Sequence, residues 1–271
     1  AFRAAVAGGL VLLAVWAAAQ RYFAGQRLFT ALLLVMVAWL LFSTLGHAAI
    51  DIGCKGTLAL MSWPVILAHA VLWAGFLHQY VGTRDERPAP GLLAAVLLPY
   101  TALALAALSN GAHGLLYGAG SGLGPPELGL PRMRYERGPL FVALAAWGYA
   151  WLAVSLVTLG RAWHEAADGE RRQWAVFLAI MAVPVASNLA YVFAGWRPLG
   201  GDPTPLSYGA ALAGFAWMIR RGQLFTAVPL ARRLLFAELP DPVLVLDPQG
   251  RVRDANRAAE QLAGAAPPPG R

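Results

Sequence analysis

The chain has 271 residues, of which 58% are hydrophobic and 13% are charged. Soluble domains carry about a quarter charged residues, so the composition excludes an ordinary soluble domain and indicates a chain surrounded mostly by lipid. The net charge of +7 comes from arginines spread between apolar blocks. This spread favours membrane-topology signals over nucleic-acid binding. The single cysteine, Cys54, excludes an internal disulfide and a zinc site built from cysteines.

Windows without charges predict seven transmembrane helices. A charge at the centre of a membrane helix costs about 2.5–3.5 kcal/mol, and about 17 residues are enough to span the hydrocarbon layer. The predicted helices cover residues 4–20, 28–49, 58–82, 91–109, 139–160, 173–196 and 204–220. We therefore expect an all-α membrane protein with a seven-helix bundle in residues 1–221. The alternative, a cleaved signal peptide in the first window, would leave six helices.

The arginines predict the orientation of this bundle. Positive charges collect in cytoplasmic connections. Arg161, Arg171 and Arg172 share one predicted connection, and Arg220 and Arg221 follow the last helix on the same side. The excess over the opposite side is modest, but it places the N-terminus outside and the C-terminus in the cytoplasm.

Beyond residue 221 the sequence changes character. Residues 222–238 resemble an amphipathic helix at the membrane surface. Two short predicted strands, 241–247 and 251–255, flank a turn with glycine and predict a β-hairpin, and Asn256 is a good N-cap for a following helix. A hairpin and one helix cannot bury a core alone, so we expect residues 239–271 to open an α+β domain that continues further.

The lysine content excludes one class of seven-helix protein. A retinal-binding protein needs a lysine amine in its seventh helix to form a Schiff base. The lysine of this chain, Lys55, falls in the predicted connection between the second and third helices. We therefore expect no retinal and no other cofactor.

Two helices carry polar side chains along one face. The stripe on the third helix is Ser62, Ile66, His69 and Trp73, and the stripe on the sixth is Pro184, Ser187, Asn188 and Tyr191. Polar groups at membrane depth must find partners and often mark a ligand or proton path. We take His69, Asn188 and Tyr191 as candidate ligand-binding residues. The alternative is hydrogen bonding that only holds the helices together.

A second group of candidates lies on the predicted outer side. Asn110 and His113 follow the fourth helix, while Asp202 and Thr204 precede the seventh. Because both segments emerge on the same side, a small polar site is one interpretation. The other is structural, with Asp202 before a proline starting one helix and Asn110 before a glycine ending another.

Two further motifs on that side carry less information. His47, Asp51 and Cys54 could bind a soft metal, but their spacing matches no standard site, and we expect no metal. The glycines in residues 118–124 lack a preceding strand, so we interpret this stretch as a flexible loop and not as a phosphate-binding loop.

The order of these parts resembles the N-terminal seven-transmembrane sensor region of bacterial histidine kinases. The resemblance rests on LSNGAH at 108–113, GDPTP at 201–205 and VPLAR at 228–232. The stretch LPDPVLVLDPQGRVRDANRAA at 239–259 looks like the opening of a PAS domain, with Asp247, Gly250, Arg251 and Asn256 in the expected pattern.

The resemblance implies a multi-pass sensor of the bacterial inner membrane. A small-molecule or membrane stimulus would shift the last helix, with signal coupling through Pro205, Arg220, Arg221 and Pro229 to cytoplasmic PAS and kinase domains. It also implies a homodimer, and Ala210 and Gly214 offer a small-residue contact face. A response regulator would meet only the kinase domains. Residues 1–271 should therefore have no kinase activity.

Three other interpretations stay open. The same sensor module could control a diguanylate cyclase, because nothing before residue 271 separates the two outputs. A small transporter fits less well, since the helix number is odd and no inverted repeat is evident. A structural membrane anchor would not need the polar residues inside the bundle.

Overall fold

The computed structural model describes residues 2–20, 23–82, 88–127, 130–166, 168–198, 202–221, 236, 238–246, 250 and 252–263. The chain divides into two units, Ala1–Arg221 and Gly222–Arg271. Most of the predicted juxtamembrane helix at 222–238, including the predicted coupling residue Pro229, lies outside the described residues.

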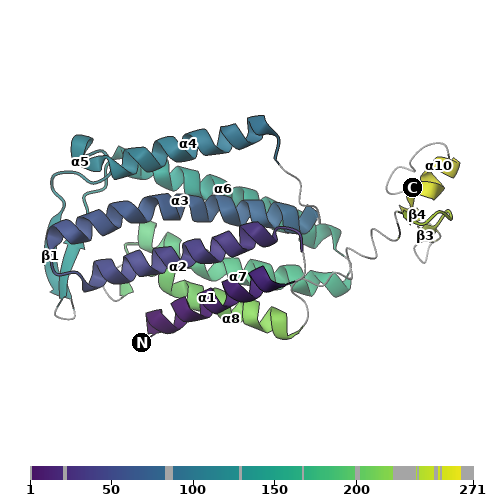
Figure 1. Ribbon diagram of the computed structural model, residues 1–271, viewed down its shortest axis with the longest axis horizontal. Coiled ribbons are helices and arrows are strands. Elements are labelled where there is room, and N and C mark those ends of the chain that lie inside the picture. The colour runs from purple at the N-terminus through teal and green to yellow at the C-terminus, as the bar shows by residue number, and fades with distance from the viewer. Residues whose placement is uncertain are drawn as a thin grey trace. The chain divides into compact units, whose positions relative to one another are not determined.

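The first unit is a bundle of long helices (Figure 1). Six of the described helices are long and apolar enough to cross a membrane: α1 (Phe2–Ala19), α2 (Gln26–Ala48), α3 (Ile52–Gly82), α4 (Pro90–Leu108), α6 (Pro139–Glu165) and α7 (Asp168–Phe193). The seventh, α8 (Thr204–Arg220), has 17 residues and a length of about 25 Å. Its start is set by Pro205, because proline fits the first turn, where its missing N–H has no partner to lose.

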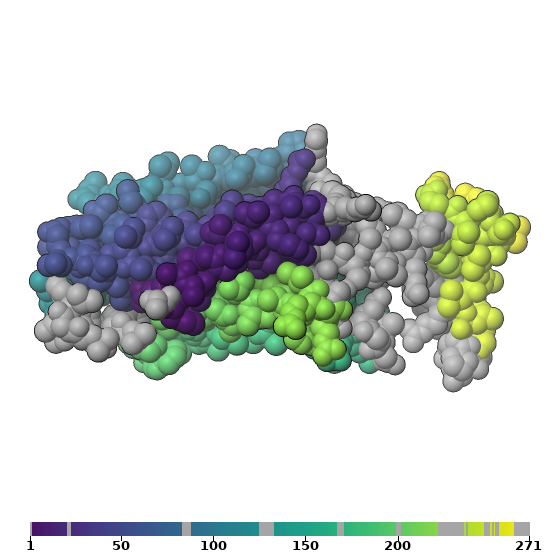
Figure 2. All heavy atoms as spheres, turned by 60° about the horizontal axis from the view of Figure 1, so that its bottom comes forward, coloured from purple at the N-terminus to yellow at the C-terminus, as the bar shows by residue number. Residues whose placement is uncertain are grey.

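Five of these helices form a closed ring. Helix α2 packs on α3, α3 on α6, α6 on α7, and α7 on α8. Helix α8 packs on α2, which closes the ring. The other two long helices lie outside this ring, where α1 packs on α2 and α8, and α4 packs on α3 and α6. Figure 2 shows α1 on the surface between α2 and α8.

Glycines allow α8 to approach its neighbours closely. A Cβ atom at Gly9 in α1 would overlap Leu212, and one at Gly214 in α8 would lie 2.5 Å from a side-chain carbon of Ile180 in α7. Gly214 therefore packs inside the bundle, while Ala210 is exposed. The homodimer, with a contact face that includes both residues, stays a prediction, and Gly214 already has a packing role within the chain.

One end of the ring is filled by phenylalanine. Phe29, Phe76, Phe177 and Phe215 come from α2, α3, α7 and α8, and each is at most 1% exposed. Their rings lie 4.9 Å (Phe29–Phe76), 5.2 Å (Phe29–Phe215) and 6.3 Å (Phe177–Phe215) apart between centroids. We call this group the phenylalanine plug. It closes the ring at the end where α8 finishes.

Helix α3 begins earlier than the predicted residue 58. The carboxylate of Asp51 accepts a hydrogen bond of 2.7 Å from the backbone N–H of Cys54, which satisfies a donor at the helix start. Lys55 consequently lies in the first turn of α3 and not in a connection. Its amine donates to the carbonyl oxygens of Gly46 (2.8 Å) and His47 (3.4 Å), and only 4% of the residue is exposed. A lysine there stabilises the C-terminal end of α2.

The glycine-rich stretch after α4 is more ordered than predicted. The short helix α5 (Asn110–His113) leads to an antiparallel hairpin of β1 (Gly122–Glu127) and β2 (Leu130–Arg134). The backbones of Tyr117 and Arg137 pair in an isolated antiparallel β-bridge outside this hairpin. The interpretation as a loop is wrong for residues 122–124, which lie in β1, because β2 supplies backbone partners that the local sequence does not reveal.

The second unit contains the hairpin and helix start predicted for it. Strands β3 (Leu244–Leu246) and β4 (Val252–Ala255) pair antiparallel, and α10 (Arg257–Ala263) follows. The prediction of Asn256 as N-cap is confirmed, because its side-chain oxygen accepts a hydrogen bond of 3.0 Å from the N–H of Ala259. The same oxygen accepts from Val243 N–H, and its amide donates to the carbonyls of Leu239 and Asp241.

Candidate ligand-binding site

A cavity of about 380 Å³ lies inside the five-helix ring. Side chains of α2, α3, α6, α7 and α8 line it, and Phe215 of the phenylalanine plug contributes to its floor. Most of the wall is aromatic or aliphatic, with a few polar groups among the rings. This combination of size and lining is typical of small-molecule binding sites.

Both polar stripes predicted from the sequence contribute to this cavity. On α3 the four predicted residues all line it: Ser62, Ile66, His69 and Trp73. On α7, Pro184, Asn188 and Tyr191 line it, whereas Ser187 does not. Residues three or four positions apart share one side of a helix, so each stripe faces the centre of the ring.

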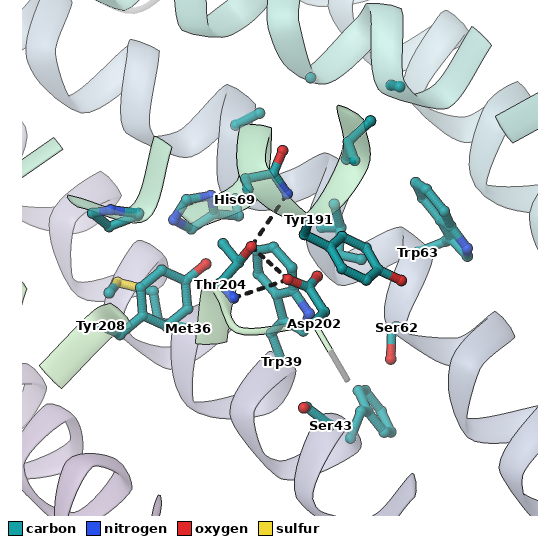
Figure 3. Close-up of a pocket in the computed structure, with 18 of the residues that line it drawn as sticks. Met36, Trp39, Ser43, Ser62, Trp63, His69, Tyr191, Asp202, Thr204 and Tyr208 are labelled. Atoms are coloured by element: carbon teal, nitrogen blue, oxygen red, sulfur yellow. Dashed lines mark hydrogen bonds between the residues drawn. The ribbon is translucent and has the colours of Figure 1, made fainter. Parts of the chain in front are cut away.

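A chain of hydrogen bonds joins three cavity-lining segments, and Figure 3 shows the part of it between Thr204 and Asp202. Tyr149 of α6 donates from its hydroxyl to the side-chain oxygen of Asn188 at 3.0 Å. The amide of Asn188 donates to the hydroxyl of Thr204 at 3.2 Å, and that hydroxyl donates to Asp202 at 2.6 Å. The structure thus brings three of the predicted site residues together, Asn188, Thr204 and Asp202, and links α6 and α7 to the start of α8.

Asp202 is the carboxylate of this chain of bonds. It precedes α8, and its Oδ1 atom also accepts the backbone N–H of Thr204 at 2.9 Å. Burial raises the pKa of this carboxyl above its usual value, while the two bonds from Thr204 and the nearby charge of Arg137 act in the opposite direction. Asp202 therefore helps to start α8, as in the structural interpretation, and also lines the cavity.

Tyr191 lies between two arginines. The guanidinium carbon of Arg137 is 5.2 Å from the centre of the Tyr191 ring, and that of Arg197 is 5.5 Å from it. Arg137 also lies 4.4 Å from the ring centre of Phe141 and donates to the carbonyl of Val192 at 3.0 Å. Cation–π contacts of this kind fix the position of the tyrosine ring in the cavity wall.

Two tyrosines and the hairpin close the cavity at its other end. Tyr117 and Tyr135 pack with ring centres 4.4 Å apart, and the indole of Trp63 donates to the Tyr117 hydroxyl at 3.0 Å. Both tyrosines line the cavity together with Met133 of β2. Burial raises the pKa of the Tyr135 hydroxyl to about 12 and raises that of Tyr117 further.

The two candidates after α4 lie outside the cavity lining. The side chain of Asn110 bonds to the backbone of Leu116 and Tyr117, with all three contacts between 2.8 and 3.2 Å. His113 contacts the carbonyl of Ala106 at 2.9 Å and accepts from the N–H of Leu115 at 2.9 Å. Their side chains therefore shape the turn after α4. The structure does not join them to Asp202 and Thr204 in one site.

Several residues of the cavity wall were not among those predicted from the sequence. Trp39 of α2, Tyr149 of α6 and Tyr208 of α8 all line it. A signal for α8 was present, because Thr204, Tyr208, Ala211 and Phe215 recur at helical spacing and all four line the cavity. The other residues of α8 are also mostly apolar, so this pattern does not stand out in the sequence.

The predicted coupling residues in the described chain occupy the two ends of α8. Pro205 is buried in the first turn. Arg220 ends the helix, and Arg221 follows it with its guanidinium 5.8 Å from the ring centre of Trp217. Their positions do not test the predicted role in signal coupling, which stays a prediction.

No group of three or more His, Cys, Asp or Glu side chains is placed to hold a metal ion within the described ranges. Of the weak sequence candidates, Asp51 caps α3, Cys54 is exposed, and the ring of His47 contacts the carbonyl of Ser43 at 2.6 Å.

Fold and site together define a multi-pass membrane protein with a small-molecule-sized cavity inside its helical ring. Residues 2–229 match the sequence model of the N-terminal 7TM region of histidine kinase, and residues 236–269 match a PAS fold. No curated protein and no solved structure matches the chain. The first match covers most of the chain. The chain therefore belongs to the family of N-terminal seven-transmembrane regions of histidine kinases, here followed by PAS sequence. It is a sensor region.

Proposed function

We propose that the cavity receives the stimulus of a sensor histidine kinase and that α8 transmits it to cytoplasmic PAS and kinase domains. The observation that carries the proposal is the position of α8. This helix lines the cavity with Thr204, Tyr208, Ala211 and Phe215, and it is also the helix that leads toward the PAS sequence. A molecule in the cavity would contact the output helix directly.

A shift of α8 requires the stimulus to favour one of two bundle arrangements. The contacts that hold α8 are suited to such a change. At one end it is bound by the hydrogen bond from Asn188 to Thr204, and at the other by the ring of Phe215 within the phenylalanine plug. A ligand that moves α7 against α8 would alter both.

Arginine and tryptophan support a cytoplasmic C-terminus for this membrane sensor. The end of α6 and the start of α7 place the guanidinium of Arg171 5.8 Å from the ring of Trp163. Arg172 lies 5.5 Å from the ring of Trp217 in α8. Tryptophans with arginines at helix ends are typical of a membrane interface, and positive charge favours the cytoplasmic side.

The test fills the cavity and measures the output. A Cβ atom at Gly148 in α6 would meet nothing within 4 Å, and this glycine lines the cavity, so Gly148→Leu starts a side chain in open space and takes up cavity volume. We expect autophosphorylation of the native full-length protein in membrane vesicles to change at least about threefold, equivalent to about 0.7 kcal/mol between two states.

The matched control is Gly160→Leu. Gly160 lies on the same helix and does not line the cavity, and a Cβ atom there would also meet nothing within 4 Å. The gain in helix propensity is therefore the same. We expect unchanged output from this variant. Equal outputs from both variants would overturn cavity sensing. Synthesis of cyclic diguanylate without autophosphorylation would leave sensing intact and replace the kinase output with the cyclase alternative.

A further inference from the structure

Three rings meet inside the cavity, each from a different helix. The ring of His69 in α3 lies 5.8 Å from that of Trp39 in α2 and 5.4 Å from that of Tyr208 in α8, and Trp39 and Tyr208 are 5.7 Å apart. All three residues line the cavity (Figure 3). We call them the aromatic triad. Its flat faces and edges suit a flat ring compound better than a flexible chain.

Tyr208 holds a polar group with no hydrogen-bonding partner among the described residues. The residue is 1% exposed, and its hydroxyl oxygen is buried. Buried polar groups are almost always hydrogen-bonded in native proteins, so an exception of this kind asks for an explanation. A ligand oxygen in the adjoining cavity would supply the missing partner.

The charges around the cavity argue against an ionic ligand. Lys55 already donates to two carbonyl oxygens, and Arg197 lies over the ring of Tyr191. Asp202 accepts two hydrogen bonds from Thr204. Lys55 and Arg197 would repel a cation, and the Asp202 carboxylate would repel an anion. The group of opposite charge already has its own hydrogen bonds or ring contact in each case. The aromatic triad itself presents no carboxylate and no lysine or arginine, and an unpaired charge buried there would be unfavourable.

We propose that the cavity binds an uncharged, flat ring compound carrying an oxygen, of the chemical class of phenols, whose oxygen hydrogen-bonds to the Tyr208 hydroxyl. The ring of the ligand packs against the side of the aromatic triad that lines the cavity. A phenolic oxygen both donates and accepts, which matches a tyrosine hydroxyl free to do either. This inference rests on the proposed function, because it identifies the chemistry of the stimulus at the same cavity.

The test uses the whole chain in lipid nanodiscs and isothermal titration with three probes that share one ring system. The probes are 2-naphthol, which is neutral, 2-naphthoate, which is an anion, and 2-naphthylmethylamine, which is a cation. Empty nanodiscs correct for partition into lipid. We expect saturable binding of 2-naphthol and at least about tenfold weaker binding of both ions. Tighter binding of either ion would overturn the proposal.

Two tyrosine variants locate the contact. Tyr208→Phe removes only the hydroxyl, so we expect the bundle to stay folded and 2-naphthol to bind about 3- to 10-fold more weakly. Tyr100→Phe is the control, because Tyr100 also loses a hydroxyl that bonds the carbonyl of Pro64, at a position away from the cavity. Equal affinities of Tyr208→Phe and the unaltered chain would overturn the proposed contact.

Gly148→Leu separates the two proposals. If it changes autophosphorylation while 2-naphthol fails to bind the unaltered chain, the ligand class is wrong and cavity sensing stands. If it abolishes 2-naphthol binding without changing autophosphorylation, the binding site stands and the proposed sensing function is wrong.

Discussion

The amide of Asn188 donates a hydrogen bond of 3.2 Å to the hydroxyl of Thr204, and this contact joins the middle of the cavity wall to the first residue of α8. Both partners have a second bond, Asn188 from Tyr149 and Thr204 to Asp202. Within the bundle these side chains therefore position the start of α8 relative to α6 and α7.

The first prediction removes the central hydroxyl of this chain. Thr204→Val keeps the side-chain shape but removes the acceptor of the Asn188 amide and one of the two donors to the Asp202 carboxylate. We therefore expect a loss of about 1–3 kcal/mol in unfolding free energy. Denaturant-induced unfolding in mild detergent measures it. Thr158→Val is the control, since the Thr158 hydroxyl bonds to the carbonyl of Val154 in its own helix and the residue does not line the cavity. Similar losses in both variants would contradict the role of Thr204.

The second prediction concerns Lys55. Lys55→Met keeps the length of the side chain but removes the donor that serves the carbonyls of Gly46 and His47. We expect a stability loss of about 1–3 kcal/mol, because the last carbonyls of α2 lose a charged donor in a buried place. Thermal unfolding followed by circular dichroism measures it. Thr57→Val, on the exposed side of the same first turns, should stay within about 0.5 kcal/mol.

The third prediction is a dependence on pH through Asp202. Burial raises the pKa of this carboxyl in the folded bundle, so the folded state binds the proton more tightly than the unfolded state does. The resulting stabilisation is complete below the unfolded pKa of about 4 and is lost as pH rises through the folded pKa. Acidification from pH 7 toward pH 4 should therefore raise the Tm of the unaltered chain relative to Asp202→Asn. Parallel pH profiles of the two proteins would contradict it.

The fourth prediction concerns Asn256 in the second unit, which is 1% exposed and makes four side-chain hydrogen bonds. Asn256→Ala leaves all four backbone groups unpaired, whereas Asn256→Asp keeps the two accepted bonds and loses the two donated ones. We expect proteolysis of residues 239–263 to accelerate in the order unaltered chain, Asn256→Asp, Asn256→Ala. Equal rates for all three would show that Asn256 does not hold this hairpin and helix together.

The sequence alone determined that the chain is a seven-helix membrane bundle with a strand-containing tail. Hydrocarbon excludes charge, so windows free of charge mark the spans without knowledge of any contact. Helical periodicity placed His69, Asn188 and Tyr191 on inward faces, since a side chain three or four residues away shares its side of the helix. The PAS-like opening followed from residues close together in the chain, where the hairpin and N-cap are local structures.

Only the tertiary structure decided which of these residues share a site. Lys55 and Gly46 meet because α2 and α3 pack side by side, and the hairpin of β1 and β2 forms because two segments supply each other's backbone partners. In the sequence Tyr208 looks like one more residue of a mostly apolar membrane helix. The tertiary structure shows that its ring packs against Trp39 and His69. Helix packing fixes these neighbours through the summed shapes of five helices, and no local pattern within one helix contains that information.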